Sequence, residues 1–283
     1  MQIIDNIPAY GTSIEEGALA QIKTCARTAA HVALMADHHK GYAMPIGGVV
    51  AYVDSISPCG VGFDIACGNK AVLTDASAND VKANIATIMN DIWRTISFGI
   101  GRKNDNERVD HDLFDDPAWS IAACKPLKEM ARQQLGTVGS GNHYVDIFED
   151  EIGRIWIGVH FGSRGLGHKT ATWFLKAAGA KDGMDVKPCI LPVDSHLGAE
   201  YLEGMRLGGY AYAGRDWVCG RVEASVRLLS RRFTITTTSP GERVTRDVIS
   251  GWCEKARRRH FLGSADLSVD RWRYLGDHRR RRS

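Results

Sequence analysis

The sequence lacks any uninterrupted apolar run of about 18 residues, the minimum for a membrane-spanning helix. Its first residues also lack the basic head and apolar core of a secretory leader. Cysteine is sparse and irregular: the seven cysteines are an odd number without close regular spacing, which does not fit a disulfide framework. We therefore expect a cytoplasmic protein with reduced thiols and no membrane partner.

Excess charge of one sign is missing from most of the chain. Residues 1–235 carry 24 basic and 27 acidic side chains, a balance of −3. Residues 236–283 carry 12 basic and 6 acidic side chains, a balance of +6, and end in a run of arginines. A basic segment of this kind, taken alone, is typical of contacts with nucleic-acid phosphates.

Regular alternation of strands and helices is absent as well. Ser13, with Glu16 three residues later, predicts the start of a helix. Apolar spacing predicts further helices over residues 78–96 and 195–233, and the run 155–159 predicts a buried strand. Because these elements do not alternate as in a doubly wound sheet, a mixed α+β fold is the better prediction.

Four segments share a glycine-rich turn that holds one or two chemically capable side chains. Glycine permits positive φ and lets a ligand approach the main chain closely. The segments read DHHKGYAMPIGG, GVGFDIACG, GSGNHY and VHFGSRGLGH, and begin at Asp37, Gly60, Gly139 and Val159.

Three of these segments supply a candidate metal-binding set. Each histidine alone fits a structural or exposed role, and a lone Asp-x-x-Cys fits a tight structural loop. Together the set offers carboxylate, thiolate and imidazole ligands, which suit manganese or zinc, and a thiolate or carboxylate could bridge two ions. The candidate ligands are Asp64, Cys67, His143 and His160.

The loop GSRGLGH adds a candidate phosphate site. Ser163, Arg164 and the neighbouring backbone amides suit a phosphate or sulfate, because a guanidinium and N–H groups both donate to anions. The alternative for this loop is a solvated turn.

Five segments together resemble the successive signatures of the RtcB family of RNA ligases. They are DHHKGYAMPIGGVVA, SPCGVGFDIACG, TVGSGNHYVDI, VHFGSRGLGHK and YLEGMRLGGYAYAGRD, in order within residues 30–220. The resemblance implies a mixed α+β fold with a β-sheet core surrounded by helices, here incomplete at the C-terminus. It also implies a GTP- and manganese-dependent enzyme that joins RNA 2′,3′-cyclic phosphate or 3′-phosphate ends to 5′-hydroxyl ends in tRNA splicing and RNA repair.

The resemblance further implies roles for individual residues. Asp64, Cys67, His143 and His160 would hold two manganese ions, with Cys67 as the bridge. The guanylate and phosphate site would be lined by Asn142, His143, Tyr144, Val145 and Asp146, with Ser163 and Arg164 on the phosphate.

The family pattern stops after Ile235. A His-His-Asn segment, a KGATPAFPGQ segment, a GGSM loop and the stretch with the guanylylated histidine should follow, and none is present. Reading each codon one base earlier can turn Thr236–Gly241 into His-His-Asn-Phe-Ala-Trp, and Cys253–Ala265 into a stretch containing Lys-Gly-Ala-Thr-Pro-Ala-Phe-Pro-Gly-Gln. Our hypothesis is therefore a one-base deletion near codons 235 and 236.

This hypothesis divides the chain into two parts. Residues 1–235 would be the N-terminal part of the ligase domain. Residues 236–283 would be an out-of-frame tail without a proper fold, basic by accident. The chain would be inactive, since His168 and His260 are poor substitutes for the guanylylated histidine. Two alternatives are a metal-dependent phosphoesterase with the same four ligands, and a non-catalytic RNA-binding remnant that uses Arg164 and the tail.

Overall fold

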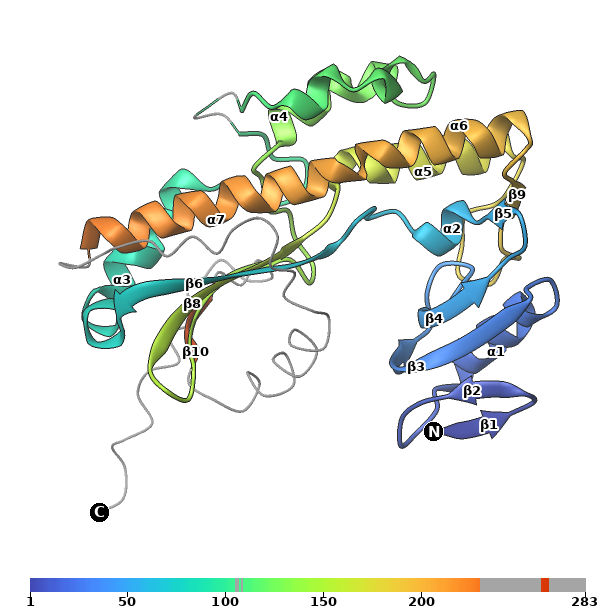
Figure 1. The fold of residues 1–283 in the computed structure, drawn as a ribbon, viewed down its shortest axis with the longest axis horizontal. Helices are drawn as coiled ribbons and strands as arrows, with labels where there is room; N and C mark the ends of the chain where they lie inside the picture. Colours follow the sequence, from blue (N-terminus) through green and yellow to red (C-terminus); the bar gives the residue numbers. More distant parts are fainter. Residues whose placement is uncertain (105–106, 108, 230–260, 265–283) are drawn as a thin grey trace. The chain divides into compact units, whose positions relative to one another are not determined.

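The computed structural model describes residues 1–104, 107, 109–229 and 261–264. These residues form two compact units, and the chain passes from one to the other five times (Figure 1). The first unit holds residues 1–65, 112–128 and 165–208, and the second holds the described residues within 66–111, 129–164 and 209–283. Neither unit is a continuous segment, so each depends on contacts between residues far apart in the sequence.

The first unit contains a four-stranded sheet with one helix packed on it. The strand order is β1 (Gln2–Ile4), β2 (Ile7–Ala9), β3 (His31–His39) and β4 (Ile46–Ala51), antiparallel except for β2 and β3. Helix α1 (Glu16–Ala26) packs Ile22 and Cys25 against Leu34 of the sheet. Burial of these fully covered side chains stabilises the unit through the hydrophobic effect.

The predicted start of α1 at Ser13 is wrong. The helix begins at Glu16, and the preceding residue Glu15 takes the N-cap position without a side-chain hydrogen bond. Ser13 lies on the segment that leads into the helix and lines a hollow described below. A capping-box pattern therefore occurs here without the capping geometry.

The rest of the first unit consists of short elements and two helices. The small strands β5 (Ser55–Ile56) and β9 (Leu191–Pro192) form an antiparallel pair. Ser57 caps the helix α2 (Pro58–Val61), and Ser195 caps α6 (His196–Gly204). Helix α5 (Arg164–Ala177) starts at the boundary of the units, and four 3-10 turns complete the set: η1 (Asp112–Asp115), η2 (Pro117–Ser120), η3 (Lys125–Leu127) and η4 (Met205–Gly208).

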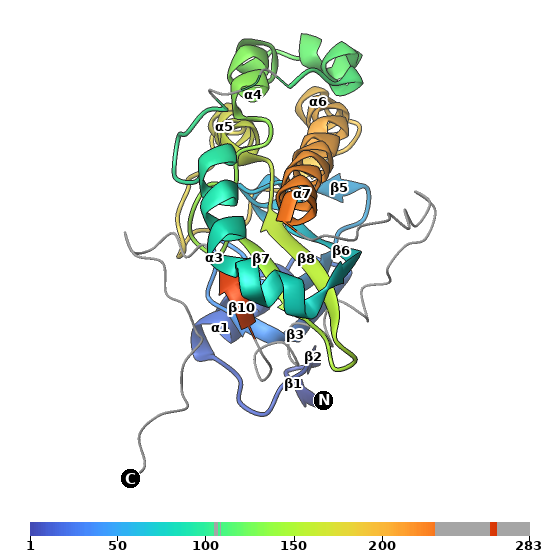
Figure 2. The same ribbon diagram turned by 90° about the vertical axis from the view of Figure 1, so that its left-hand side faces the viewer.

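The second unit is an antiparallel sheet with helices packed on one face. The strand order is β10 (Phe261–Ser264), β7 (Tyr144–Glu149), β8 (Arg154–Phe161) and β6 (Gly68–Ser77). Helices α3 (Ala78–Thr95) and α7 (Gly209–Leu229) contact each other and the sheet, and the short α4 (Lys128–Gln134) precedes β7. Figure 2 faces this unit, with α3 and α7 beside the strands.

Period-two alternation along β8 builds the core of the second unit. Ile155, Ile157, Val159 and Phe161 are almost fully buried and pack with α3 and α7. The residues between them point to the opposite face, because successive side chains of a strand alternate. One face of the sheet is therefore committed to the core and the other is available for polar side chains.

The predicted α+β fold is confirmed, as are the helix over residues 78–96, the strand over 155–159 and the mostly helical stretch that contains α6 and α7. The predicted tail, residues 236–283, lies mostly outside the described residues. Its described part, Phe261–Ser264, forms β10 and pairs with β7. Among the described residues, no helix is long and apolar enough to cross a membrane.

Candidate metal centre

The register of three neighbouring strands brings polar side chains together on the face opposite the core. Asn69 on β6 and Tyr144 on β7 both lie directly opposite His160 on β8. Directly opposed residues of antiparallel strands project to the same face and contact one another. The three side chains therefore form one row across the sheet, and the Tyr144 and His160 rings stack with centroids 5.5 Å apart.

Cys67 and His143 join this row from the residues that precede two strands. Cys67 comes directly before β6 and His143 directly before β7, while His160 lies near the end of β8. Since β6 and β7 are antiparallel to β8, these positions meet at the same edge of the sheet. The Cys67 Sγ lies 3.4 Å from Nε2 of His160 and 4.0 Å from Nε2 of His143.

Hydrogen bonds fix the protonated nitrogen of His160. Oδ1 of Asn69 accepts a hydrogen bond from the Tyr144 hydroxyl at 2.7 Å and lies 3.0 Å from Nδ1 of His160. Because this oxygen only accepts, Nδ1 of His160 must carry the proton. In the neutral ring Nε2 then carries the lone pair. This nitrogen faces Cys67, and the Asn142 amide nitrogen lies 3.3 Å from it.

The same reasoning applies to His143. Its Nδ1 lies 2.8 Å from the carbonyl oxygen of Val138, so in the neutral ring this nitrogen donates and Nε2 keeps the lone pair. In a metal site a ligating histidine donates its other ring N–H to a carbonyl or side-chain oxygen in just this way. Both neutral histidines therefore present a nitrogen lone pair, which could bind a metal ion, toward the Cys67 sulfur.

Asp64 completes the group from the turn that carries Cys67. Single ligand atoms of Asp64, Cys67 and His143 all lie within 4.8 Å of one another. Ala66, between the two turn residues, has a left-handed φ of 57°, an uncommon conformation for a residue with a Cβ. The sulfur of Cys67 thus has His143 and His160 as neighbours, and oxygen, sulfur and imidazole donors of this kind fit manganese or zinc.

Arg164 lies against the His143 ring. Its Nη1 is 3.2 Å from Nδ1 of that histidine, and its backbone φ of 54° is left-handed. Gly139 makes room for the guanidinium: a Cβ at this glycine would meet it at 2.0 to 2.3 Å. An alanine here would displace the guanidinium, and the φ of 91° favours glycine.

The other predicted nucleotide-site residues differ in their orientation. Asn142 and Tyr144 contact His160, as described above. Asp146 follows on the same face of β7 and is buried, whereas Val145 points into the core with α3 and α7 and can offer only its backbone. Ser163 is 1% exposed, and its hydroxyl has no hydrogen-bond partner among the described residues.

Sequence reasoning missed the supporting residues. Asn69 sets the tautomer of His160 and follows Cys67 by two positions, but only the strand register reveals its partner. Arg215 lies in the signature YAGRD and donates to the carbonyl oxygen of Ala66, next to Cys67. The only signal in the sequence was an arginine at the spacing of the apolar face of a predicted helix, and it did not indicate the partners of Arg215.

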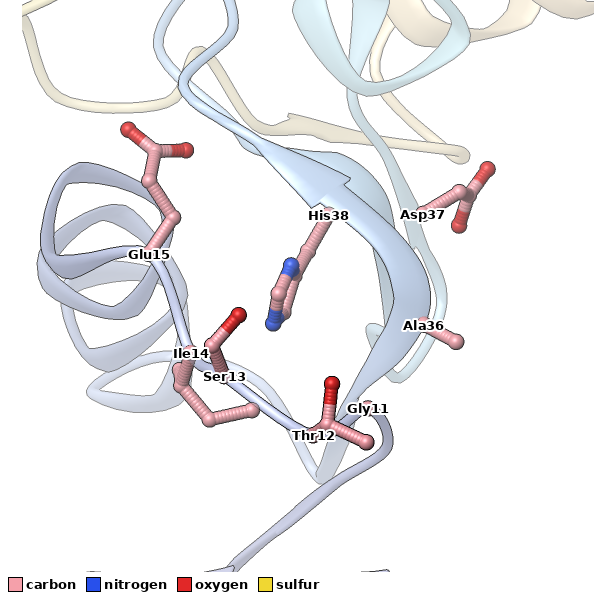
Figure 3. A pocket seen from close by; sticks show the side chains of 8 residues that line it. All are labelled: Gly11, Thr12, Ser13, Ile14, Glu15, Ala36, Asp37 and His38. Atoms are coloured by element: carbon pink, nitrogen blue, oxygen red, sulfur yellow. The ribbon is translucent and has the colours of Figure 1, made fainter.

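The segment DHHKGYAMPIGG contributes to a separate feature, a hollow of about 680 Å³ within the first unit. Figure 3 shows the His38 imidazole pointing into it and the Asp37 side chain pointing away. Neither ring nitrogen of His38 has a hydrogen-bond partner among the described residues. The hollow is lined by Gly11, Thr12, Ser13, Ile14, Glu15, Ala36, Asp37 and His38.

Comparison with known proteins agrees with the signature segments. The profile of the family described as tRNA-splicing ligase RtcB matches residues 18–240. A tRNA-splicing ligase RtcB of Nanoarchaeum equitans is 29% identical over 253 residues, covering 71% of this chain and 53% of the relative. That of Thermococcus kodakarensis is 28% identical, covering 70% and 52%, and the RNA-splicing ligase RtcB of Escherichia coli is 32% identical, covering 52% and 40%.

The chain spans about half the length of the curated relatives it matches. The family match nevertheless covers most of the chain and includes every residue of the metal-binding group. The chain therefore belongs to the RtcB family, whose members are RNA ligases.

Proposed function

We propose that this chain carries the metal-binding part of a GTP- and manganese-dependent RNA ligase. Its substrates would be RNA ends with a 2′,3′-cyclic phosphate or 3′-phosphate and RNA ends with a 5′-hydroxyl, as in tRNA splicing and RNA repair. The observation that carries the proposal is the pair of bare Nε2 atoms on His143 and His160 beside the Cys67 sulfur.

One group of residues would bind the metal and another would bind the phosphate and the guanylate. Asp64, Cys67 and the two histidines would hold the manganese. Manganese bound there would polarise phosphoryl oxygens and offset developing negative charge. Arg164 would hold the phosphate, because its guanidinium lies beside His143 in the space that Gly139 leaves open. Asn142, Tyr144 and Asp146 would line the guanylate side, with Ser163 as a further donor.

We propose that this polypeptide does not complete ligation by itself. The family's guanylylated histidine belongs to a segment expected after Ile235, and the hypothesis of a shifted reading frame places that segment out of frame. His168 is no replacement, since its ring packs on Phe63 within the first unit, with centroids 5.2 Å apart. His260 lies outside the described residues. None of the six cysteines among the described residues forms a disulfide, which supports a reducing cytoplasmic location.

Labelled GTP tests the proposal. The chain as given should form no covalent guanylate adduct with manganese, whereas a chain with the reading frame restored at codon 235 should form one and ligate RNA. In the restored chain, Cys67→Ser should abolish both reactions, and Cys59→Ser, a change at a half-buried thiol of the first unit, should leave them intact. An adduct on the unrestored chain, or ligation by restored Cys67→Ser, would contradict it.

A second candidate is a metal-dependent phosphoesterase. The observation that favours it is that the metal-binding group and Arg164 lie together without any residue after 235. Release of phosphate from an RNA 3′-phosphate with manganese but without GTP would identify this activity. RNA binding by the tail, the third possibility raised from the sequence, falls outside the described residues. Loss of RNA binding on removal of residues 236–283 would identify it.

A further inference from the structure

Arg215 is a buried charge with an unusual set of partners. The side chain lies on α7 and is only 3% exposed, and burial lowers the pKa of its guanidinium. Arginine nevertheless stays charged in proteins. A buried charge requires compensating hydrogen bonds, so its partners indicate what the residue is for.

The guanidinium holds two backbone positions that flank two candidate metal ligands. Nη1 donates to the carbonyl oxygen of Ala66 at 3.0 Å and to that of Phe161 at 2.5 Å. Ala66 directly precedes Cys67, and Phe161 directly follows His160. A single nitrogen therefore ties the start of β6 to the end of β8 at the level of the sulfur and the imidazole.

The backbone at Ala66 explains why such support is needed. Its φ of 57° is left-handed, a region that a residue with a Cβ disfavours. The hydrogen bond from Arg215 fixes the carbonyl of this strained residue, and thereby the direction in which the chain enters Cys67. The guanidinium itself is restrained by the Tyr212 ring, with Cζ 4.7 Å from the ring centroid.

We propose that Arg215 is a positioning residue of the metal centre. It holds Cys67 and His160 at the separation at which both can bind one ion, and it does so through the backbone rather than by touching ion or substrate. This inference rests on the proposed metal-binding function. It makes the geometry of the centre depend on helix α7, which lies on the opposite, core face of the sheet.

Cobalt binding to the full chain tests this role. Cobalt(II) bound by a thiolate gives a charge-transfer absorption band, and its titration reports affinity and geometry without any catalytic step. Loss of an outer partner of a metal ligand typically lowers affinity about 10- to 100-fold. For Arg215→Met we expect a loss of cobalt affinity of this size and a charge-transfer band of altered shape. An unchanged circular dichroism spectrum would show that the variant is folded.

Two further variants make the result specific. Arg215→Lys keeps the charge but shortens the side chain, so it should fold and still bind cobalt about 10-fold more weakly. Arg221→Met removes another arginine of α7, which is partly exposed and contacts Trp217 and Glu107, and it should bind as the unchanged chain does. Unchanged affinity and band shape in folded Arg215→Met or Arg215→Lys would overturn the proposal.

A direct ligand variant separates this proposal from the one on which it rests. If the unchanged chain and Cys67→Ser bind cobalt identically, the metal site itself is wrong. In that case, a measurement on the metal-free protein tests the positioning role of Arg215. Nitrogen-15 NMR of the histidine side chains should show His160 protonated at Nδ1 in the unchanged chain and perturbed in Arg215→Lys. An identical His160 signal in both proteins would overturn the positioning role as well.

Discussion

The two faces of the second sheet are built from the same strands yet have opposite chemistry. On β8, Ile157, Val159 and Phe161 are buried against α3 and α7, whereas His160 faces the polar row with Asn69 and Tyr144. A one-residue slip of register would exchange the two faces. The buried face therefore fixes which residues reach the candidate metal site at the end of these strands.

Truncation of a side chain on the core face should cause the largest loss of stability. Ile157→Ala removes a fully buried side chain and should lower the free energy of unfolding by about 2–5 kcal/mol in urea titrations. Leu73→Ala, on the other face of the neighbouring strand and 39% exposed, should cost about 1 kcal/mol or less. Equal losses for the two variants would show that the faces do not differ as described.

A pair of glycines tests the crowded approach of Arg164 to His143. Both Gly139→Ala and Gly141→Ala place a Cβ at positive φ, which costs roughly 1–2 kcal/mol. Only Gly139→Ala also meets the guanidinium, because nothing lies within 4 Å of a Cβ at Gly141. Gly139→Ala should therefore be clearly the less stable variant in thermal unfolding. Equal stability would mean that Arg164 is not seated there.

Substitutions of Asn69 and Tyr144 test whether the polar row sets the tautomer of His160. Asn69→Leu removes the acceptor that holds Nδ1 of His160 and should weaken cobalt binding about 10- to 100-fold by titration. Tyr144→Phe leaves that acceptor in place and should weaken binding by about 10-fold or less. A stronger effect of Tyr144→Phe than of Asn69→Leu would contradict the assigned tautomer.

The smallest effect concerns the turn between β7 and β8, which sets their register. Burial opposes ionisation of Asp150, but hydrogen bonds from Trp156, Arg154 and Ile152 outweigh it and lower its pKa to about 2, against 3.8 ordinarily. A carboxyl with a depressed folded pKa contributes stability above its unfolded pKa and loses it as pH falls.

The lowered pKa of Asp150 in the folded protein determines how the unfolding free energy depends on pH. Stability supplied by Asp150 should be fully present above about pH 5 and disappear between roughly pH 4 and 2. Asp150→Asn should flatten the fall in unfolding free energy over this interval. An identical slope in the variant would show that the carboxylate does not stabilise the turn.

Local patterns in the sequence predicted part of this arrangement. The apolar runs placed β8 and α3, and the glycine-rich segments held the residues of the metal-binding group. The tautomers of His143 and His160 were not predictable, because they depend on the Val138 carbonyl and on Asn69, which register brings close. The start of α1 is the local error: Ser13 and Glu16 fit a capping box, but the helix begins at Glu16.

Arg215 and the interleaved units depend on contacts between distant segments. No local period signals that a helix residue near position 215 will bond to the carbonyl oxygens at 66 and 161. Periodicity predicted a long helical stretch. Only the folded structure shows that Arg215 of this stretch donates to the two carbonyl oxygens beside the candidate metal ligands.

X-ray absorption of the zinc-loaded full chain tests the central claim most directly. We expect one sulfur at about 2.3 Å and imidazole nitrogens at about 2.0–2.1 Å from the metal, with the sulfur lost in Cys67→Ser. A shell of oxygen atoms alone, or a sulfur that persists in Cys67→Ser, would contradict it.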